Sequence, residues 1–437
     1  MSHHRLNDVY GIARDLPLNY EPRELVDEVF VNNLTRDKHI VVFGSSKQGK
    51  TSLRKYNLED DDYVVVTCSN RWTTLGPLHT AILKAAGYTV EQGTTKTADG
   101  SFKITVKAEG KAGLPLIAQA KAGGEAAGEV GIGKQTTTAP LELDPVDVND
   151  IIAALKQLAF TKFIVLEDFH YLPDDTQRDF AVALKAFHEG SDLCFIVVGV
   201  WLDKNRLIQH NGDLTGRVIG VNADAWTRAE LLAVIDKGEA LLNITFDHAF
   251  KEGLTADCFE SVSVVQEACH RVCEEAGIAA TQDEPRVVGD GVDPATVIRD
   301  VVDTQSARYS SFIQNFADGF QDTELEMYRW LLLPVLVASP QDLEAGLTYT
   351  QIRKLISAHH PKGEINPGNV TQALQSTASL QVSKMKIKPI ILDFDQSKRR
   401  LTVVDRGFLP WLGHQDRLEL LELAGLPKPA AELTLLD

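Results

Sequence analysis

Residues 44–51 have the spacing GxxxxGK[ST], which is typical of a loop that binds phosphate. An apolar, β-branched run at 39–43 precedes this loop, and residues 51–56 can begin a helix. A strand, a loop and a helix N-terminus in this order aim backbone N–H groups and a positive dipole end at phosphate oxygens. We therefore expect this loop, extended by one residue, to bind a nucleotide through Gly44, Ser45, Ser46, Lys47, Gln48, Gly49, Lys50, Thr51 and Ser52.

Within this loop, hereafter the P-loop, two side chains have predicted roles. Lys50 would reach the β- and γ-phosphates of ATP, and the Thr51 hydroxyl would ligate Mg²⁺. ATP and Mg²⁺ are thus the expected cofactors.

Two adjacent carboxylates, Glu167 and Asp168, end a second buried run at 163–166. Neighbouring side chains of a strand point to opposite faces, so the two acids cannot share one job. Glu167 is expected to help hold Mg²⁺ and Asp168 to polarise the attacking water. Aspartate is usual at the first position, so the extra methylene of Glu167 must be absorbed by a shift of the metal or by an intervening water.

A third buried run lies at 193–200. It is followed by Arg217 on a loop and then by two helical stretches, which completes a recognisable order along the chain. Between about residues 39 and 280 this order resembles the AAA+ superfamily, in the branch of the STAND signalling ATPases and the Orc1/Cdc6-type initiator ATPases. The resemblance implies a P-loop ATPase that works as a homo-oligomer. It also implies that Arg217 reaches the γ-phosphate of a neighbouring subunit, because a planar guanidinium neutralises charge on phosphoryl oxygens. The alternative role for Arg217 is that of a surface arginine capping a helix.

The chain also departs from the pattern of these families. A polar sensor residue is expected after the third run, where Gly199, Val200 and Trp201 stand, and Asp203 and Asn205 are the nearest substitutes. Residues 260–266 lack the Gly-x-Pro signature of STAND relatives.

Size and composition predict a multidomain protein in a reducing compartment. The chain has 437 residues, and its five cysteines are odd in number and scattered, which suits the cytoplasm. No apolar run approaches the ~20 residues of a membrane span, and the N-terminus lacks a signal-peptide core, so we expect no membrane association. The net charge is −17, yet residues 351–407 carry ten basic and four acidic side chains, a local charge of +6.

The predicted fold class is α/β: a P-loop NTPase parallel sheet with a helical lid and a C-terminal winged helix-turn-helix domain. The predicted divisions are an ATPase core at 1–222 with an insertion at 88–145, a lid at 223–285, a linker at 286–322 and the winged helix at 323–437. In the insertion, residues 102–107 alternate with a period of two, as a strand with one wet face does. The Gly/Ala-rich stretch that follows is equally compatible with a flexible surface hairpin and with a segment that contacts a partner.

The C-terminal region contains a helix near residues 352–356, a second helix beginning at Asn366 and Pro367, and two β-runs joined by a basic loop. This order resembles a winged helix-turn-helix. Asn369 and Gln372 would face outward and could contact base edges of double-stranded DNA. The loop residues Lys398, Arg399 and Arg400 could hold phosphates. The alternative is a domain that contacts protein or acts as an intramolecular latch.

Two functions remain open from the sequence. In the first, an ATP-binding and ATP-hydrolysing oligomeric switch couples its nucleotide state to assembly on DNA. In the second, a signalling or antiviral-defence ATPase senses a protein partner, with the winged helix as latch. The basic C-terminal region favours the first, and the overall acidity and the insertion favour the second.

Overall fold

A five-stranded parallel sheet forms the centre of the N-terminal part. The computed structural model describes residues 3–11, 15–96, 102–108, 141–201, 206–319, 324–383, 385, 387, 389–396 and 398–427. The sheet runs in the order β2-β6-β7-β1-β8. Its strands are β1 (His39–Phe43), β2 (Tyr63–Thr67), β6 (Phe163–Glu167), β7 (Phe195–Val198) and β8 (Val218–Asn222). The predicted α/β parallel-sheet fold is confirmed, with the P-loop after β1 and the two acids at the end of β6.

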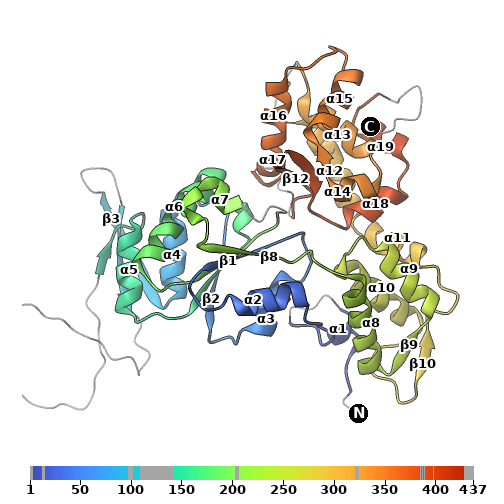
Figure 1. The fold of residues 1–437 in the computed structure, drawn as a ribbon, viewed down its shortest axis with the longest axis horizontal. Helices are drawn as coiled ribbons and strands as arrows, with labels where there is room; N and C mark the ends of the chain where they lie inside the picture. Colours follow the sequence, from blue (N-terminus) through green and yellow to red (C-terminus); the bar gives the residue numbers. More distant parts are fainter. Residues whose placement is uncertain are drawn as a thin grey trace, which may run out of the picture.

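Helices cover both faces of this sheet (Figure 1). One face packs against α4 (Leu75–Ala85), α5 (Val148–Gln157) and α6 (Asp174–Gly190), and the other against α2 (Val29–Asn32) and α3 (Lys50–Asn57). A short helix, α7 (Arg206–His210), follows β7. Alternation along β1 shows why both layers are needed, since Val41 and Phe43 join the first apolar layer whereas Ile40 and Val42 join the second. A strand buried on both faces is continuously apolar, as the sequence of β1 is.

The insertion contributes a separate antiparallel sheet in the order β3-β4-β5. Its strands are β3 (Tyr88–Lys96), β4 (Phe102–Ala108) and β5 (Leu141–Leu143). In β4, Ile104 and Val106 are buried while Lys103 is exposed, as the period-two pattern predicted. The Gly/Ala-rich stretch lies outside the described residues.

The lid is a helical bundle beside the sheet. It contains α1 (Leu6–Val9), α8 (Arg228–Leu242), β9 (Ile244–Phe246), α9 (His248–Asp257), α10 (Val262–Glu275), β10 (Arg286–Val288) and α11 (Pro294–Asp303). Thr227 and Glu230 form a capping box that starts α8. Helix α10 begins at Val262, directly after a turn in which Phe259 and Glu260 have positive φ angles of 50° and 52°.

The stretch predicted as a linker, 286–322, is instead folded over its described part. It contains β10, α11 and a further helix, α12 (Ser306–Asp318), whose apolar sides are buried. Pro294 is the first residue of α11 and Asp293 caps it, so the proline starts a helix here rather than interrupting one.

The C-terminal domain is mixed helix and sheet, and it lies above the junction of sheet and lid in Figure 1. Its helices are α13 (Met327–Val337), α14 (Pro340–Ala345), α15 (Tyr349–His359), α16 (Pro367–Gln375), α17 (Thr377–Ser383), α18 (Phe408–His414) and α19 (Arg417–Leu423). Strands β11 (Leu347–Thr348), β12 (Leu392–Asp395) and β13 (Arg400–Val403) form an antiparallel sheet in the order β11-β13-β12. Asn366 caps α16 and Pro367 is its first residue, as predicted.

One continuous apolar core joins the lid, α11, α12 and the C-terminal domain, whereas the two faces of the sheet have cores of their own. Across the described residues, none of the helices is both long and apolar enough to span a membrane.

Candidate nucleotide-binding site

The loop between β1 and α3 has a backbone suited to phosphate. Gly49 precedes α3 with a φ of 80°, and Lys47 has a φ of 61°. Gly49 occupies the position where a side chain would cap the helix, and it has none. The N–H groups of the first turn of α3 therefore lack a local side-chain partner and can donate to an anion.

Lys50 is folded back onto its own loop. Its Nζ donates to the carbonyl oxygen of Gly44 at 3.0 Å and to that of Ser45. Burial lowers the pKa of Lys50 to about 8, opposed by the charges of Asp224, Glu167 and Asp168. The ammonium is thus held among carbonyls and acids at the place where phosphates would lie.

The two acids follow β6, which pairs in parallel with β2 on one side and β7 on the other. Glu167 is the last residue of β6. Asp168 has a φ of 57°, so the chain turns sharply between the two carboxylates. This turn places both acids at the cavity described below, although a regular strand would direct them to opposite faces.

A buried arginine accompanies Glu167. Arg54 of α3 places its Nη2 3.4 Å from Oε1 of Glu167, and its guanidinium lies over the ring of Tyr63 at 4.4 Å. Burial raises the pKa of Glu167, and the charge of Arg54 opposes that rise. The long glutamate side chain is what allows this contact with α3.

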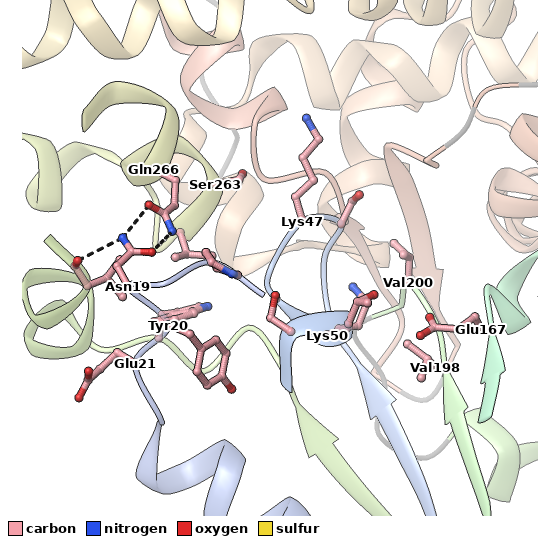
Figure 2. A pocket seen from close by; sticks show the side chains of 18 of the residues that line it. Asn19, Tyr20, Glu21, Lys47, Lys50, Glu167, Val198, Val200, Ser263 and Gln266 are labelled. Atoms are coloured by element: carbon pink, nitrogen blue, oxygen red, sulfur yellow. Dashed lines mark hydrogen bonds between the residues drawn. The ribbon is translucent and has the colours of Figure 1, made fainter. Parts of the chain in front are cut away.

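Residues of the P-loop and the two acids line one cavity of about 350 Å³ between the sheet and the lid (Figure 2). The P-loop contributes Ser46, Lys47, Gly49, Lys50, Thr51 and Ser52, and the chain at the end of β6 contributes Glu167 and Asp168. Gly44, Ser45 and Gln48 of the predicted set do not line the cavity, and Ser45 and Gln48 are buried. In Figure 2 the side chain of Lys47 points away from Lys50.

The donor set suits Mg²⁺. Thr51 offers a hydroxyl, and Glu167 and Asp168 offer carboxylates, all hard oxygen ligands. Among the described residues, no group of three or more His, Cys, Asp or Glu side chains could hold a metal by itself. A site with one or two carboxylates is what Mg²⁺ uses when nucleotide phosphates and water supply its other ligands.

The far end of the cavity lies between the N-terminal segment and the lid. Asn19 and Gln266 exchange two side-chain hydrogen bonds, both of 2.9 Å, and Tyr20 packs on Tyr56 with ring centroids 4.6 Å apart. Gly11 lines the cavity, whereas Tyr10 is buried in the lid and donates to the carbonyl of Ile235. The polar amides and the aromatic ring of Tyr20 give this end the character of a nucleobase pocket.

The P-loop makes direct hydrogen bonds to both the lid and the C-terminal domain. The buried side chain of Gln48 donates to the carbonyl of Glu260 at 3.1 Å and accepts from the N–H of Val262 at 3.3 Å, both in the lid. The N–H of Ser46 donates to the carbonyl of Val404 in the C-terminal domain at 3.2 Å.

Arg217 lies at the opposite end of the strands from the P-loop. It precedes β8, whose first residue pairs with His39 at the start of β1, whereas the P-loop follows the end of β1. A five-residue strand spans ~15 Å, so Arg217 does not reach its own cavity. Its Nη2 is 2.7 Å from Oε1 of Glu189. The predicted sensor substitutes Asp203 and Asn205 lie outside the described residues.

The C-terminal candidates divide into outward and structural residues. Gln372 is exposed and Asn369 is half-buried on α16. On the loop between β12 and β13, Lys398 is exposed and lies 3.6 Å from Asp395.

Two arginines, Arg399 of this loop and Arg400 at the start of β13, contact the domain itself. Arg399 stacks on the ring of Tyr349 at 4.2 Å, and Arg400 donates to the carbonyls of Ala345 and Gly346. Arg400 therefore fixes the loop to the end of α14.

No motif or spacing in the sequence indicated three residues of this site. Arg54, Asp224 and Arg406 each act on residues more than a hundred positions away along the chain. The five cysteines are buried and free.

Comparison with known proteins adds a likeness of the whole chain but no family. No family model matches the chain, and no curated protein matches it. The solved structures that it resembles include the Walker-type ATPase PABY2304 of Pyrococcus abyssi, at 10% identity and a TM-score of 0.49, covering 92% of this chain and 99% of that one. They also include the Aeropyrum pernix Orc1 protein in complex with DNA (10% identity, TM-score 0.42, 97% and 96%) and Cdc6p of Pyrobaculum aerophilum (11% identity, TM-score 0.36, 96% and 98%). At these values the likeness assigns no role to any residue of this chain.

Proposed function

We propose that the protein is a Mg²⁺-dependent ATPase that couples its nucleotide state to the position of its C-terminal domain. The observation that carries this proposal is the cavity that brings Lys50, Thr51, Glu167 and Asp168 together at the carboxyl ends of β1 and β6. Ligands of open α/β sheets bind at this edge of the strands.

Each residue has a role that its position supports. The N–H groups of the P-loop and Lys50 bind the phosphates, for which Lys50 exchanges the carbonyls of Gly44 and Ser45 for phosphate oxygens. Thr51 and Glu167 hold Mg²⁺, which when bound neutralises charge on the phosphate oxygens. Asp168 orients a water toward the γ-phosphorus and takes up its proton as the bond to the bridging oxygen breaks.

The coupling runs through contacts of the phosphate loop itself. Ser46 is bonded to Val404, and beside this bond Val200 after β7 packs with Val382, Ile390 and Val404 of the C-terminal domain. A nucleotide that changes the loop changes these contacts, and by linkage the position of the domain changes nucleotide affinity.

Assembly on DNA is the first candidate role of this switch. The helices α15 and α16 and the hairpin of β12 and β13 have the order of a winged helix-turn-helix, with Gln372 and Lys398 exposed. In a homo-oligomer, Arg217 would complete the nucleotide site of a neighbouring copy, once its ion pair with Glu189 is broken. The local charge of +6 around this domain supports contact with phosphates.

A protein-triggered signalling ATPase is the second candidate, favoured by a separate observation. The guanidinium of Arg406 in the C-terminal domain donates to the carbonyl of Phe259 at 2.8 Å and lies 3.3 Å from Glu260, both in the lid. A domain clamped this way on the nucleotide site can act as a latch that a partner opens.

Steady-state ATP turnover with and without double-stranded DNA, at moderate salt, tests both candidates. We expect measurable turnover that Lys50→Ala abolishes together with ATP binding, and Asp168→Asn to bind ATP but hydrolyse it at least 100-fold more slowly. Wild-type ATP affinity in the Lys50→Ala variant would exclude the P-loop assignment. Several-fold stimulation by DNA supports the first candidate, and basal turnover that DNA leaves unchanged supports the second.

A further inference from the structure

Asp224 lies in the connection between β8 and α8, with its carboxylate buried against the P-loop. The N–H of Ser45 donates to Oδ1 at 2.7 Å and to Oδ2 at 2.9 Å, and the hydroxyl of Ser45 donates to Oδ2 at 2.8 Å. We propose that Asp224 is a positioning residue for nucleotide binding, which holds the first turn of the P-loop in its phosphate-binding shape and ties it to the connection that carries the lid. This inference rests on the proposed function.

The carboxylate has few other means of stabilisation. Asp224 is 5% exposed, and none of the ion pairs in the described part of the chain includes it, although the charge of Lys50, itself a P-loop residue, acts on it from beyond ion-pair distance. Burying a carboxylate is costly unless hydrogen bonds replace its water. Here the side chain and backbone of one P-loop residue supply those bonds, so the carboxylate and the loop depend on each other.

The loop is built for this close approach. Gly44 has a φ of 138°, and a Cβ at that position would lie 2.9 Å from Oδ1 of Asp224. Ser45 is fully buried, so water cannot replace the carboxylate. Without Asp224 the N–H of Ser45 would be left unpaired or the loop would move, and either outcome must be reversed when phosphate binds.

The connection that carries Asp224 is held on its other side as well. The N–H of Ala223 donates to the carbonyl of Phe43 at 2.8 Å, and Nη1 of Arg23 donates to the carbonyl of Ala223 at 2.7 Å. The guanidinium of Arg23 lies 4.1 Å from the ring centroid of Trp226, which lines the nucleotide cavity. Since α8 of the lid begins two residues after Trp226, the P-loop and the start of the lid form one connected unit.

Calorimetric titration with MgADP, together with kcat and KM for ATP hydrolysis and the melting temperature without nucleotide, tests this role. We expect Asp224→Ala to raise Kd and KM at least tenfold (~1.4 kcal/mol) while kcat stays within threefold. Asp224→Asn should lose less, because its Oδ1 still accepts from the N–H of Ser45 although its amide cannot accept from the hydroxyl. Asp236→Ala is the matched control, since Asp236 pairs with Lys251 on the lid surface at 2.9 Å and its removal should leave Kd unchanged.

Several outcomes would overturn the inference. Wild-type Kd in both Asp224 variants would do so, as would a loss of kcat with KM unchanged or an equal loss in Asp236→Ala. If Asp224→Ala does not fold, the variants Asp224→Asn and Ser45→Ala test the role instead. Each should raise the Kd for MgADP about threefold. A wild-type Kd in both variants would count against the role. A wild type that binds no MgADP removes the proposed function and this inference together, whereas normal wild-type binding with unaffected variants removes this inference alone.

Discussion

The pair of Arg54 and Glu167 explains how a glutamate can stand where the sequence pattern favours an aspartate. The longer side chain reaches the guanidinium of Arg54, which is itself stacked on Tyr63. Burial favours the protonated carboxyl, which cannot hold Mg²⁺, and the arginine offsets that preference. Arg54 therefore supports the proposed metal site by keeping Glu167 ionised.

We expect Arg54→Met to lower kcat about tenfold and to raise the Mg²⁺ concentration needed for half-maximal turnover. A hydrogen bond to a charged group contributes ~1.5–3 kcal/mol, and its loss leaves the charge of Lys50 alone to offset the burial of Glu167. Arg54→Lys keeps the charge and should lose less. Titration of turnover with Mg²⁺ checks this, and wild-type Mg²⁺ dependence in Arg54→Met would contradict it.

At the scale of elements, His79 fixes α4 to the insertion. Its Nδ1 lies 2.9 Å from the carbonyl of Pro145, and its ring meets that of Phe187 edge to face. Burial lowers the pKa of His79 from 6.5 to about 4. As the pH falls below 6.5 the unfolded chain gains a proton that the folded chain does not, so stability falls by up to ~1.4 kcal/mol per pH unit until about pH 4.

The variant His79→Gln should therefore lose less stability than the wild type between pH 7 and pH 5, by about 2 kcal/mol. Glutamine keeps a donor for Pro145 but does not titrate. Urea unfolding at pH 7, 6 and 5 measures the difference, and His248→Gln, at an exposed lid position, is the control that should follow the wild type. Parallel pH dependence in His79→Gln and wild type would refute this assignment.

Local signals predicted some elements and misled on others. The run at 39–43 is apolar throughout and became β1 with those bounds, and the Asn366-Pro367 pair placed the start of α16. The stretch at 286–322 was predicted as a linker, yet it contains α11, which begins at Pro294. Proline starts a helix or ends one depending on whether an apolar face follows, and Val297, Ile298 and Val301 form that face.

In the candidate site, too, only the residues of a contiguous motif could be predicted from the sequence. The P-loop is contiguous, so its spacing alone predicted where Lys50 and Thr51 lie. Asp224 follows no motif and lies 179 positions from Ser45, the residue it holds, so only the sheet order reveals it. Contacts between distant segments leave no local pattern in a single sequence.

At the scale of the whole molecule, the C-terminal domain belongs with the lid rather than with the sheet. Its apolar core is continuous with that of the lid through α11 and α12, and it meets the ATPase core at Val404 and the small apolar cluster around Val200. A large, continuous interface moves as one body, whereas a small one can open. The lid and the C-terminal domain should therefore shift together against the sheet when nucleotide binds.

The clamp at Arg406 lies inside this joint body, and it acts on the P-loop through Glu260, whose carbonyl accepts from the side chain of Gln48 at 3.1 Å. Its guanidinium lies 3.0 Å from Glu344 and 3.3 Å from Glu260, besides the bond to the Phe259 carbonyl. Phe259 and Glu260 both have positive φ angles, a strained conformation that persists only when its surroundings hold it. Arg406→Glu would place a third carboxylate beside two others and release this turn.

We expect Arg406→Glu to raise ATP turnover several-fold and to increase the radius of gyration in small-angle scattering. The control is Arg353→Glu, which makes the same change of charge but breaks an exposed pair with Glu364 inside the C-terminal domain, 2.9 Å long. If Arg406 holds the switch closed, only the first variant changes turnover, because only Arg406 has partners in the lid. Equal turnover and equal dimensions in the two variants would mean that the clamp supports packing alone, and the coupling would then have to run through Ser46 and Val404.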